Sequence, residues 1–180
     1  MARLIALGPF GDLLPLQIGS VTCADVTRDV VYAVAPYQGQ QKAVSAQIKA
    51  QLGLGLPAVN RRRVAKDILC QWIGHGQWLV SAAVELDGLA AVNDQSDAWA
   101  ALEIMGDSVV DVLARLVPLD LRASVFKVDH TARSLLGHLP VSITRTGPQA
   151  FEIMVMRSMP ASLVRDLQAA MAGVAARQTH

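Results

Sequence analysis

The chain has 180 residues, with 16 lysines and arginines against 15 aspartates and glutamates, a formal net charge of +1 and a hydrophobic fraction of 52%. This length suffices for a substantial core, the charge balance argues against a nucleic-acid-binding surface, and no apolar run approaches the roughly 18 residues of a membrane-spanning helix. Because only 17% of the residues are charged, against about a quarter in a typical soluble domain, we expect a permanent protein interface to cover part of the surface.

The N-terminal segment is apolar but shorter than a signal peptide requires. Gly8, Pro9 and then Asp12 interrupt the run that begins with Met1–Leu7, so the apolar stretch is shorter than a signal core. The cytoplasm is therefore the expected location. Glycine and proline recur among leucines up to about Gly19, which predicts an irregular arm that packs on a neighbour.

Two cysteines, Cys23 and Cys70, stand far apart and form no C-x-x-C spacing. This arrangement indicates neither a disulfide framework nor a structural zinc site. We expect two buried, reduced thiols.

The first half of the chain is predicted to contain a strand and a helix before its first linker. Residues Val30–Val34 are strand formers and are closed by Pro36. From residue 40 to 52 apolar side chains recur at every fourth position and Gly53 follows, which is typical of an amphipathic helix with a glycine C-cap. The segment Gly53–Pro57 follows a helix and lacks a Lys-Ser/Thr pair, which favours a linker over a phosphate-binding loop.

Three consecutive arginines, Arg61, Arg62 and Arg63, then form a local basic cluster. Such a run usually forms a solvated face. The alternative is a docking surface for an acidic partner subunit, because arginine is enriched at interfaces and opposite charges steer association.

A hairpin is predicted next, from two strand-like segments that flank Gly74-His75-Gly76. Trp72 and Trp78 are expected to be largely buried as core or interface anchors, with stacking on a pteridine or a base as the alternative. His75 is sterically free to reach a ligand, although an exposed turn residue is the simpler interpretation. These three residues join the arginines as candidate interface residues.

The second half is predicted to alternate strands and helices. A strand over Ala98–Ile104 is followed by a helix from Asp107 or Ser108 through Leu116. Two further strands lie around residues 141–145 and 151–155, and a terminal helix begins near Ser158 and Pro160. The expected fold class is α+β, with antiparallel sheets and helices packed on one face. Residues 1–180 are expected to form one domain, either as a single unit or as two intimate lobes of about 1–90 and 91–180.

No self-sufficient catalytic site is predicted. The chain has no G-x-S-x-G motif, and its four histidines are scattered without the compact spacing of zinc ligands. Asp129-His130 is an adjacent pair without a second close ligand. Asp94 and Asp120 are candidate general acids or bases, but neither has a visible proton partner. For Asp120, which follows a helix end at Pro118, backbone capping is the favoured alternative. We therefore assign no catalytic, cofactor-binding or metal-binding residue to this chain.

Five features follow one another in a fixed order along the second half of the chain and its centre: Trp72-x-Gly74 with Trp78-Leu79, Asp94-Gln95-Ser96, Gly106, Pro118-x-Asp120-Leu121 after a helix, and Val155-Met156-Arg157-Ser158 before a terminal helix. In order and spacing they resemble the gamma subunits of heterotetrameric sarcosine oxidase, which are relatives of the folate-binding aminomethyltransferase (glycine cleavage T protein) domain. The resemblance extends from about Leu56 to Leu167. His75 departs from it, since relatives commonly carry a proline there.

The resemblance implies a non-catalytic structural or assembly subunit. Its partners would be the alpha, beta and delta subunits, which carry FAD, FMN, NAD, tetrahydrofolate and zinc. The complex would demethylate sarcosine oxidatively with O2, giving glycine, H2O2 and, with tetrahydrofolate, 5,10-methylenetetrahydrofolate. The alternative function is a stand-alone folate-binding protein of the aminomethyltransferase type. Nucleic acid and membranes are not expected as partners.

Overall fold

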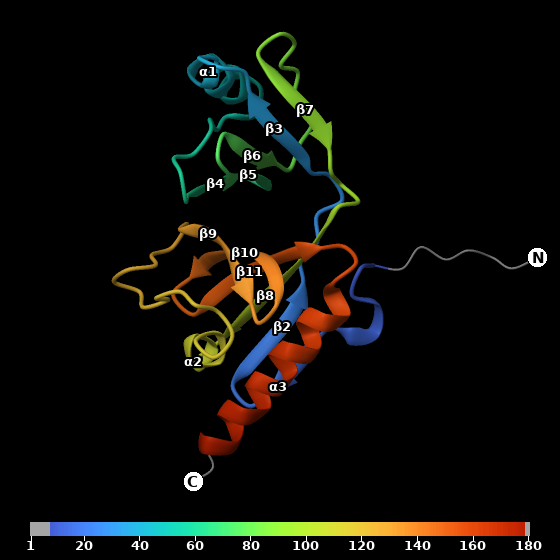
Figure 1. Ribbon diagram of the computed structural model, residues 1–180, viewed down its shortest axis with the longest axis vertical. Helices are drawn as coiled ribbons and strands as arrows, with labels where there is room; N and C mark the ends of the chain where they lie inside the picture. The colour runs from blue at the N-terminus through green and yellow to red at the C-terminus, as the bar shows by residue number, and fades with distance from the viewer. Residues whose placement is uncertain (1–7, 179–180) are drawn as a thin grey trace, which may run out of the picture.

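The computed structural model describes residues 8–178 and contains two antiparallel sheets that lie one above the other (Figure 1). The predicted α+β class is confirmed. The lower sheet has the strand order β1 (Leu16–Ile18), β2 (Val21–Asp25), β8 (Trp99–Gly106), β11 (Ala150–Met156), β10 (Leu139–Gly147) and β9 (Thr131–Leu136). The upper sheet has the order β4 (Arg62–Ala65), β5 (Ile68–Gly74), β6 (Gln77–Val80), β3 (Tyr32–Pro36) and β7 (Ala90–Asp94).

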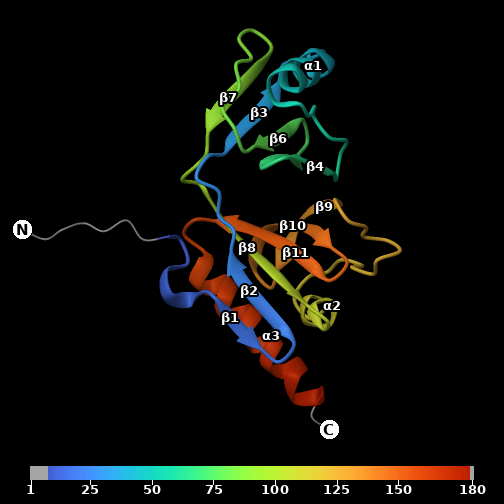
Figure 2. The same cartoon turned by 180° about the vertical axis from the view of Figure 1, so that it is seen from behind.

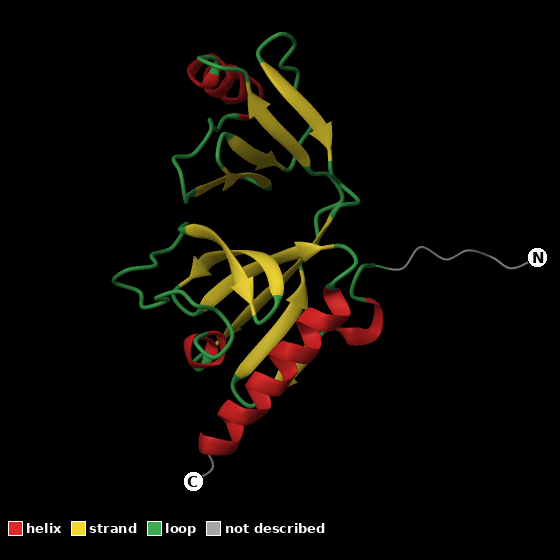
Figure 3. Ribbon diagram, in the orientation of Figure 1, coloured by secondary structure: helices red, strands yellow, loops and turns green. Residues whose placement is uncertain are grey.

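Three α-helices and one short 3-10 helix complete the described chain. In Figure 3 the α-helices lie at the periphery, outside the two sheets. None of the helices in the described part of the chain has the length and apolar character needed to cross a membrane. The helices are η1 (Gly11–Leu13), α1 (Gln41–Leu52), α2 (Val109–Leu113) and α3 (Pro160–Gln178).

The six-stranded sheet forms the larger core with α2 and α3. Alternation along β11 places Phe151, Ile153 and Val155 on the face that meets α3, and all three are fully buried. Leu163 and Leu167 recur one turn apart on α3 and pack into the same cluster. Burial of each such side chain contributes roughly 1.5–3 kcal/mol to folding.

The five-stranded sheet has a smaller core beneath α1. Val44 and Ile48 of α1 are fully buried against side chains of one sheet face, among them Trp78 and Cys70. The helix ends at Gly53, which has φ +80° and whose N–H donates to the Lys49 carbonyl. The predicted helix and its glycine C-cap are therefore confirmed.

Two segments connect the sheets, residues 26–31 on the way up and residues 95–98 on the way down, and they run side by side (Figures 1 and 2). The Gln95 N–H donates to the Val31 carbonyl at 2.8 Å, and the Val26 N–H donates to the Ala101 carbonyl at 2.9 Å. An apolar cluster that includes Leu79 from the upper sheet and Met154 from the lower sheet fills the space beside them. The two sheets thus pack directly on each other.

A buried polar network completes this junction. Gln71 of β5 is fully buried and reaches down to β10, where its Nε2 donates to Ser142 Oγ at 2.9 Å. Thr144 Oγ1 lies 3.2 Å from Gln71 Oε1 and 2.7 Å from Thr131 Oγ1, within hydrogen-bonding distance of both. Because each buried polar group has a partner, the network fixes the register of one sheet on the other without a large desolvation penalty.

Some sequence expectations need correction. The arm up to Gly19 is only partly irregular, because β1 pairs with β2; its first seven residues lie outside the described range. The helix expected through Leu116 ends at Leu113, and turns follow it. The sheets do not divide the chain near residue 90, because β1 and β2 pair with β8 in the lower sheet. The organisation into one domain or two lobes stays a prediction.

Candidate functional site

The three consecutive arginines lie at the start of β4 and have three different environments. Arg62 is nearly buried and its Nε lies 2.8 Å from Asp129 Oδ1. Arg61 forms an isolated antiparallel bridge with His130, and its Nη1 donates to the Asn60 carbonyl. Arg63 is exposed on the next position of the strand. The run is therefore not one uniform solvated face, since its middle member ties the upper sheet to the loop before β9.

Trp72 and Trp78 face each other in register on β5 and β6. Trp78 is 2% exposed and its Nε1 donates to the Pro57 carbonyl at 3.0 Å. Trp72 is half-buried, and its Nε1 is a buried donor without an acceptor among the described residues. The predicted burial is therefore confirmed for Trp78 and only partial for Trp72.

A hollow of about 260 Å³ lies beside this tryptophan pair. His75 and Gly76 form its rim on the hairpin turn, where Gly76 adopts φ +64°. Val59 contributes a 60% exposed side chain from the neighbouring loop. The hollow is lined by Gln41, Val59, Trp72, His75, Gly76 and Trp78. Three of the candidate interface residues, Trp72, His75 and Trp78, thus meet at one place.

The loop between α2 and β9 contacts the segment around Arg61 through His130, and Arg145 holds this loop in place. Arg145 is 1% exposed, its Nε donates to the Phe126 carbonyl at 2.6 Å, and its other nitrogens donate to the carbonyls of Leu121 and Pro148. Its guanidinium also stacks over the Phe151 ring. One buried cation therefore fixes the backbone of a loop that has little regular structure of its own.

Two loops are joined by backbone hydrogen bonds at the edge between the sheets. The Arg62 N–H donates to the Asp129 carbonyl, and the Thr131 N–H donates to the Asn60 carbonyl, each at 3.0 Å. Asn60 and Asp129 both adopt a left-handed backbone, with φ of 57° and 65°. Such a conformation is tolerated best by Asn and Asp among non-glycine residues. The surface formed by these loops is consequently well defined.

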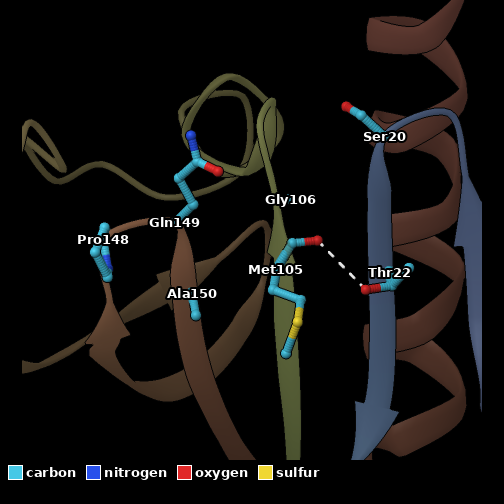
Figure 4. Close-up of a pocket in the computed structure, with 7 residues that line it drawn as sticks. All are labelled: Ser20, Thr22, Met105, Gly106, Pro148, Gln149 and Ala150. Carbon is cyan, nitrogen blue, oxygen red and sulfur yellow. Dashed lines mark hydrogen bonds between the residues drawn. The ribbon is translucent and has the colours of Figure 1, made fainter.

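A second hollow, of about 540 Å³, lies over the lower sheet and is lined by residues of β2, β8, β11 and the adjoining turns (Figure 4). Thr22, Met105 and Ala150 form one register row across β2, β8 and β11. Gly106 follows with φ +138°, and a Cβ there would lie 1.9 Å from the Ser20 carbonyl oxygen, so no other residue fits. Figure 4 shows the Met105 side chain exposed between its neighbours on this row.

The side chains weighed for chemistry have structural partners. Asp94 accepts from the Ser96 hydroxyl at 2.6 Å, and this contact lowers the pKa of its carboxyl. Hydrogen bonds from Arg122, with Nε 2.9 Å from Oδ1, lower the pKa of Asp120 to about 2. Both carboxylates cap turns, as the alternative interpretation predicted for Asp120.

The cysteines are free and buried, as predicted. Burial raises the pKa of Cys23 and of Cys70 to about 12, so both are neutral thiols at physiological pH and poor nucleophiles. Within residues 8–178 no group of three or more His, Cys, Asp or Glu side chains is arranged to hold a metal ion.

Sequence reasoning did not identify the buried contacts of Gln71 and Arg145 or the pairing of Arg61 with His130. The contacts of Gln71 with Ser142, of Arg145 with Phe126 and of Arg61 with His130 join residues at least 19 positions apart. No local sequence spacing therefore predicts them. The only available signal was the polar character of Gln71, Ser142 and Thr144 within otherwise apolar strands.

The chain shares its fold with two solved structures. The chain superposes on aminomethyltransferase T of the glycine cleavage system from Bartonella henselae with a TM-score of 0.58 and 15% identity, over 83% of this chain and 46% of that chain. It superposes more fully on a chain of heterotetrameric sarcosine oxidase from Corynebacterium sp. U-96, with a TM-score of 0.77 and 23% identity over 92% of this chain and 91% of that one.

A sequence comparison finds similarity to one subunit of such an enzyme. The chain is 29% identical over 152 residues to the sarcosine oxidase subunit gamma of Arthrobacter sp., which covers 76% of this chain and 74% of that protein. No family model matches the chain. The resemblance to sarcosine oxidase gamma subunits that the sequence motifs predicted is confirmed.

Proposed function

We propose that this chain is the gamma subunit of a heterotetrameric sarcosine oxidase and that it has a structural role in assembly. The observation that carries this proposal is the agreement of two comparisons along most of the chain, one in sequence with a gamma subunit and one in fold with a chain of the heterotetrameric enzyme. The apolar composition, with 17% charged residues, supports a chain that is partly covered by other subunits.

A non-catalytic role for this chain is the finer part of the proposal. It is supported by what the potentially reactive side chains do in the structure: Asp94 and Asp120 cap turns, and Cys23 and Cys70 are neutral core thiols. A general acid or base needs a positioned proton partner and a pKa near the working pH. The two aspartates have pKa values shifted away from that range.

The chemistry then belongs to the other subunits. In the proposed complex the alpha and beta subunits carry NAD, FAD and FMN, alpha also carries the tetrahydrofolate site, and delta holds zinc. The complex oxidises the N-methyl group of sarcosine with O2 in the cytoplasm. Its products are glycine, H2O2 and, with tetrahydrofolate, 5,10-methylenetetrahydrofolate.

The stand-alone folate protein is the less favoured alternative. Its representative, aminomethyltransferase T, is about twice as long as the part matched by this chain, which spans 46% of it. The match covers less than half of that protein, whereas it covers 91% of the sarcosine oxidase chain.

The proposal is tested by leaving the chain out. The flavin-bearing and zinc-bearing subunits of the same source are expressed with and without this chain, and assembled enzyme is measured by size-exclusion chromatography, flavin absorbance and sarcosine-dependent peroxide production. We expect omission to lower the yield of assembled enzyme while the large subunits still bind flavin. An unchanged yield and activity without this chain would contradict a role in assembly.

The cofactor content of the chain alone is a separate test. The purified chain is expected to show no flavin absorbance, no bound NAD and no stoichiometric zinc. A flavin absorption band or one equivalent of bound zinc would contradict the proposal that the cofactors reside on the other subunits.

A further inference from the structure

Positive charge is concentrated where the loop before β4 meets the loop before β9. Segments 58–63 and 120–130 together carry five cationic side chains and two carboxylates, although the whole chain has 16 cationic and 15 acidic residues. The cationic residues are Arg61, Arg62, Arg63, Arg122 and Lys127, and the carboxylates are Asp120 and Asp129.

Most of this charge has no compensating carboxylate. Asp129 is engaged by Arg62 at 2.8 Å, and Arg122 is paired with Asp120. In the described part of the chain, neither Arg61 nor Lys127 forms an ion pair. Both charges reach His130. Burial lowers the pKa of the His130 imidazole most, and the positive charges of Arg61 and Lys127 lower it further.

Exposed apolar side chains lie beside these cations. Val59 is 60% exposed and Val128 is 46% exposed, and each is next in sequence to a residue of the hydrogen-bonded loop pair, Asn60 or Asp129. The hollow of about 260 Å³ that Val59 lines contains Trp72, and the Trp72 N–H donates to the Arg61 carbonyl. The hollow therefore adjoins the backbone of Arg61, and Arg61 in turn pairs with His130.

The backbone of this surface is held in advance of binding. The two loops are joined to each other through Asn60, Arg62, Asp129 and Thr131, and Arg145 anchors the second loop from below. A surface that needs little reordering loses less conformational entropy on association. Apolar side chains in a hollow with charges at the rim are the usual composition of a specific protein interface.

We propose that Arg61, Lys127 and His130, together with Val59, Val128 and the hollow at Trp72, are a docking surface for an acidic segment of another subunit. An apolar side chain of that segment enters the hollow, and its carboxylates face the cations. The commitment to an acidic occupant follows from the uncompensated positive charge. A protein occupant is favoured over nucleic acid because the chain as a whole carries a net charge of only +1. The inference rests on the proposed function, because it requires partner subunits.

The test compares two double charge reversals in the co-expressed complex. Arg61→Glu with Lys127→Glu reverses the proposed surface. Arg165→Glu with Arg177→Glu makes the same net change on exposed positions of α3, which covers the opposite face of the lower sheet. Tagged chain is captured from each strain, and the partner subunits recovered with it are quantified at two salt concentrations. Far-ultraviolet circular dichroism and the denaturation midpoint establish that each variant is folded.

We expect the first pair to reduce partner recovery at least about tenfold and the α3 pair to change it by less than about twofold, with wild-type recovery falling as salt screens the contact. Equal recovery for both pairs would overturn the inference while leaving the proposed function intact. Equal loss for both pairs would also overturn it, because the effect would then come from net charge. Failure of the wild-type chain to capture any subunit would overturn the proposed function and this inference with it.

A second measurement does not depend on the variants. Hydroxyl-radical labelling of Val59, Val128 and His130 is compared between the wild-type complex and the free chain at low concentration. The proposal predicts that all three side chains are protected in the complex. Unchanged labelling in an intact complex would overturn it.

Discussion

The two sheets differ in how their faces are covered. The central strand β11 of the lower sheet is buried on both faces, with Phe151 and Ile153 toward α3 and Met154 toward the upper sheet. The edge strand β7 of the upper sheet is exposed at four of its five positions. The lower sheet is therefore the scaffold, and the upper sheet with its adjoining loops presents the surface on which we expect partner contacts. Stability and interaction are thus concentrated in different parts of one chain.

The largest effect is expected in the scaffold. Phe151 is fully buried, stacks on Phe126 with centroids 6.4 Å apart and lies under the Arg145 guanidinium. Phe151→Ala should lower the free energy of unfolding by about 4 kcal/mol, because it leaves a cavity and releases the anchored loop. Urea denaturation followed by circular dichroism measures this, with Phe151→Leu as the milder control. A loss below about 1 kcal/mol would contradict the central place of this ring.

The corresponding change in the upper sheet should have a slightly smaller effect. Trp78→Ala removes a buried indole and leaves the Pro57 carbonyl without its donor. A cost of about 3 kcal/mol is expected, because the hollow beside it allows water and side chains to relax into the space. The matched control is Trp72→Ala, whose half-buried ring should cost less. If the two variants had the same denaturation midpoint as the wild type, the upper core would not depend on this hairpin.

An intermediate effect is expected at the junction of the sheets. Gln71→Leu removes the side chain that joins Ser142 and Thr144, leaving their hydroxyls with fewer partners. A loss of about 1–2 kcal/mol follows from the desolvation of these buried groups. The triple variant Gln71→Leu, Ser142→Ala, Thr144→Val should recover much of it, because no polar group is then left unpaired. Failure of the triple variant to recover stability would show that the network contributes more than its own hydrogen bonds.

Burial of the two thiols should make stability depend on pH under alkaline conditions. Burial raises the pKa of both thiols to about 12 in the folded chain, above the value of about 8.5 expected in the unfolded chain. The folded state therefore favours the neutral thiols, and their contribution is fully present below about pH 8.5 and lost as the pH rises toward 12. The midpoint of urea unfolding should fall over this range, and it should fall less in the Cys23→Ala, Cys70→Ala variant.

Thiol reactivity provides a direct check of the same burial. At pH 8 the native chain should react with a disulfide reagent far more slowly than the unfolded chain, which should release two equivalents. Rapid reaction of either thiol in the native chain would contradict its place in the core.

Periodicity identified the elements whose faces alternate between solvent and core. The helix over residues 41–52, the hairpin at His75 and the terminal helix were all predicted from local spacing. Strands β2, β4 and β7 were missed, because each is short and either carries polar residues or lies at a sheet edge. The pairing of β2 and of β7 is also non-local: β2 joins β8 through partners such as Val21 and Gly106, and β7 joins β3. Hydrogen bonding over such a sequence distance leaves no local pattern.

The candidate surface was predicted in part for the same reason. Trp72, His75 and Trp78 belong to one predicted hairpin, so their closeness followed from the predicted turn, whereas Arg61 was predicted only as part of a separate basic cluster. Lys127 and His130 lie more than 60 positions after Arg61, and His130 meets Arg61 only through the bridge between two loops. His130 was weighed as a metal ligand from its neighbour Asp129, whereas that carboxylate pairs with Arg62. A charge count along the sequence cannot show which cations remain uncompensated after folding.

We propose that this chain is a permanent subunit of a larger flavin-bearing enzyme. The sharpest test is native mass spectrometry of the material captured through a tag on this chain, after co-expression with the flavin-bearing and zinc-bearing subunits. We expect one dominant species that contains one copy of each of the four subunits, together with flavin, whereas the chain expressed alone should self-associate through its uncovered apolar surface. Recovery of the tagged chain only as a monomer, without the other subunits at either low or high salt, would contradict it.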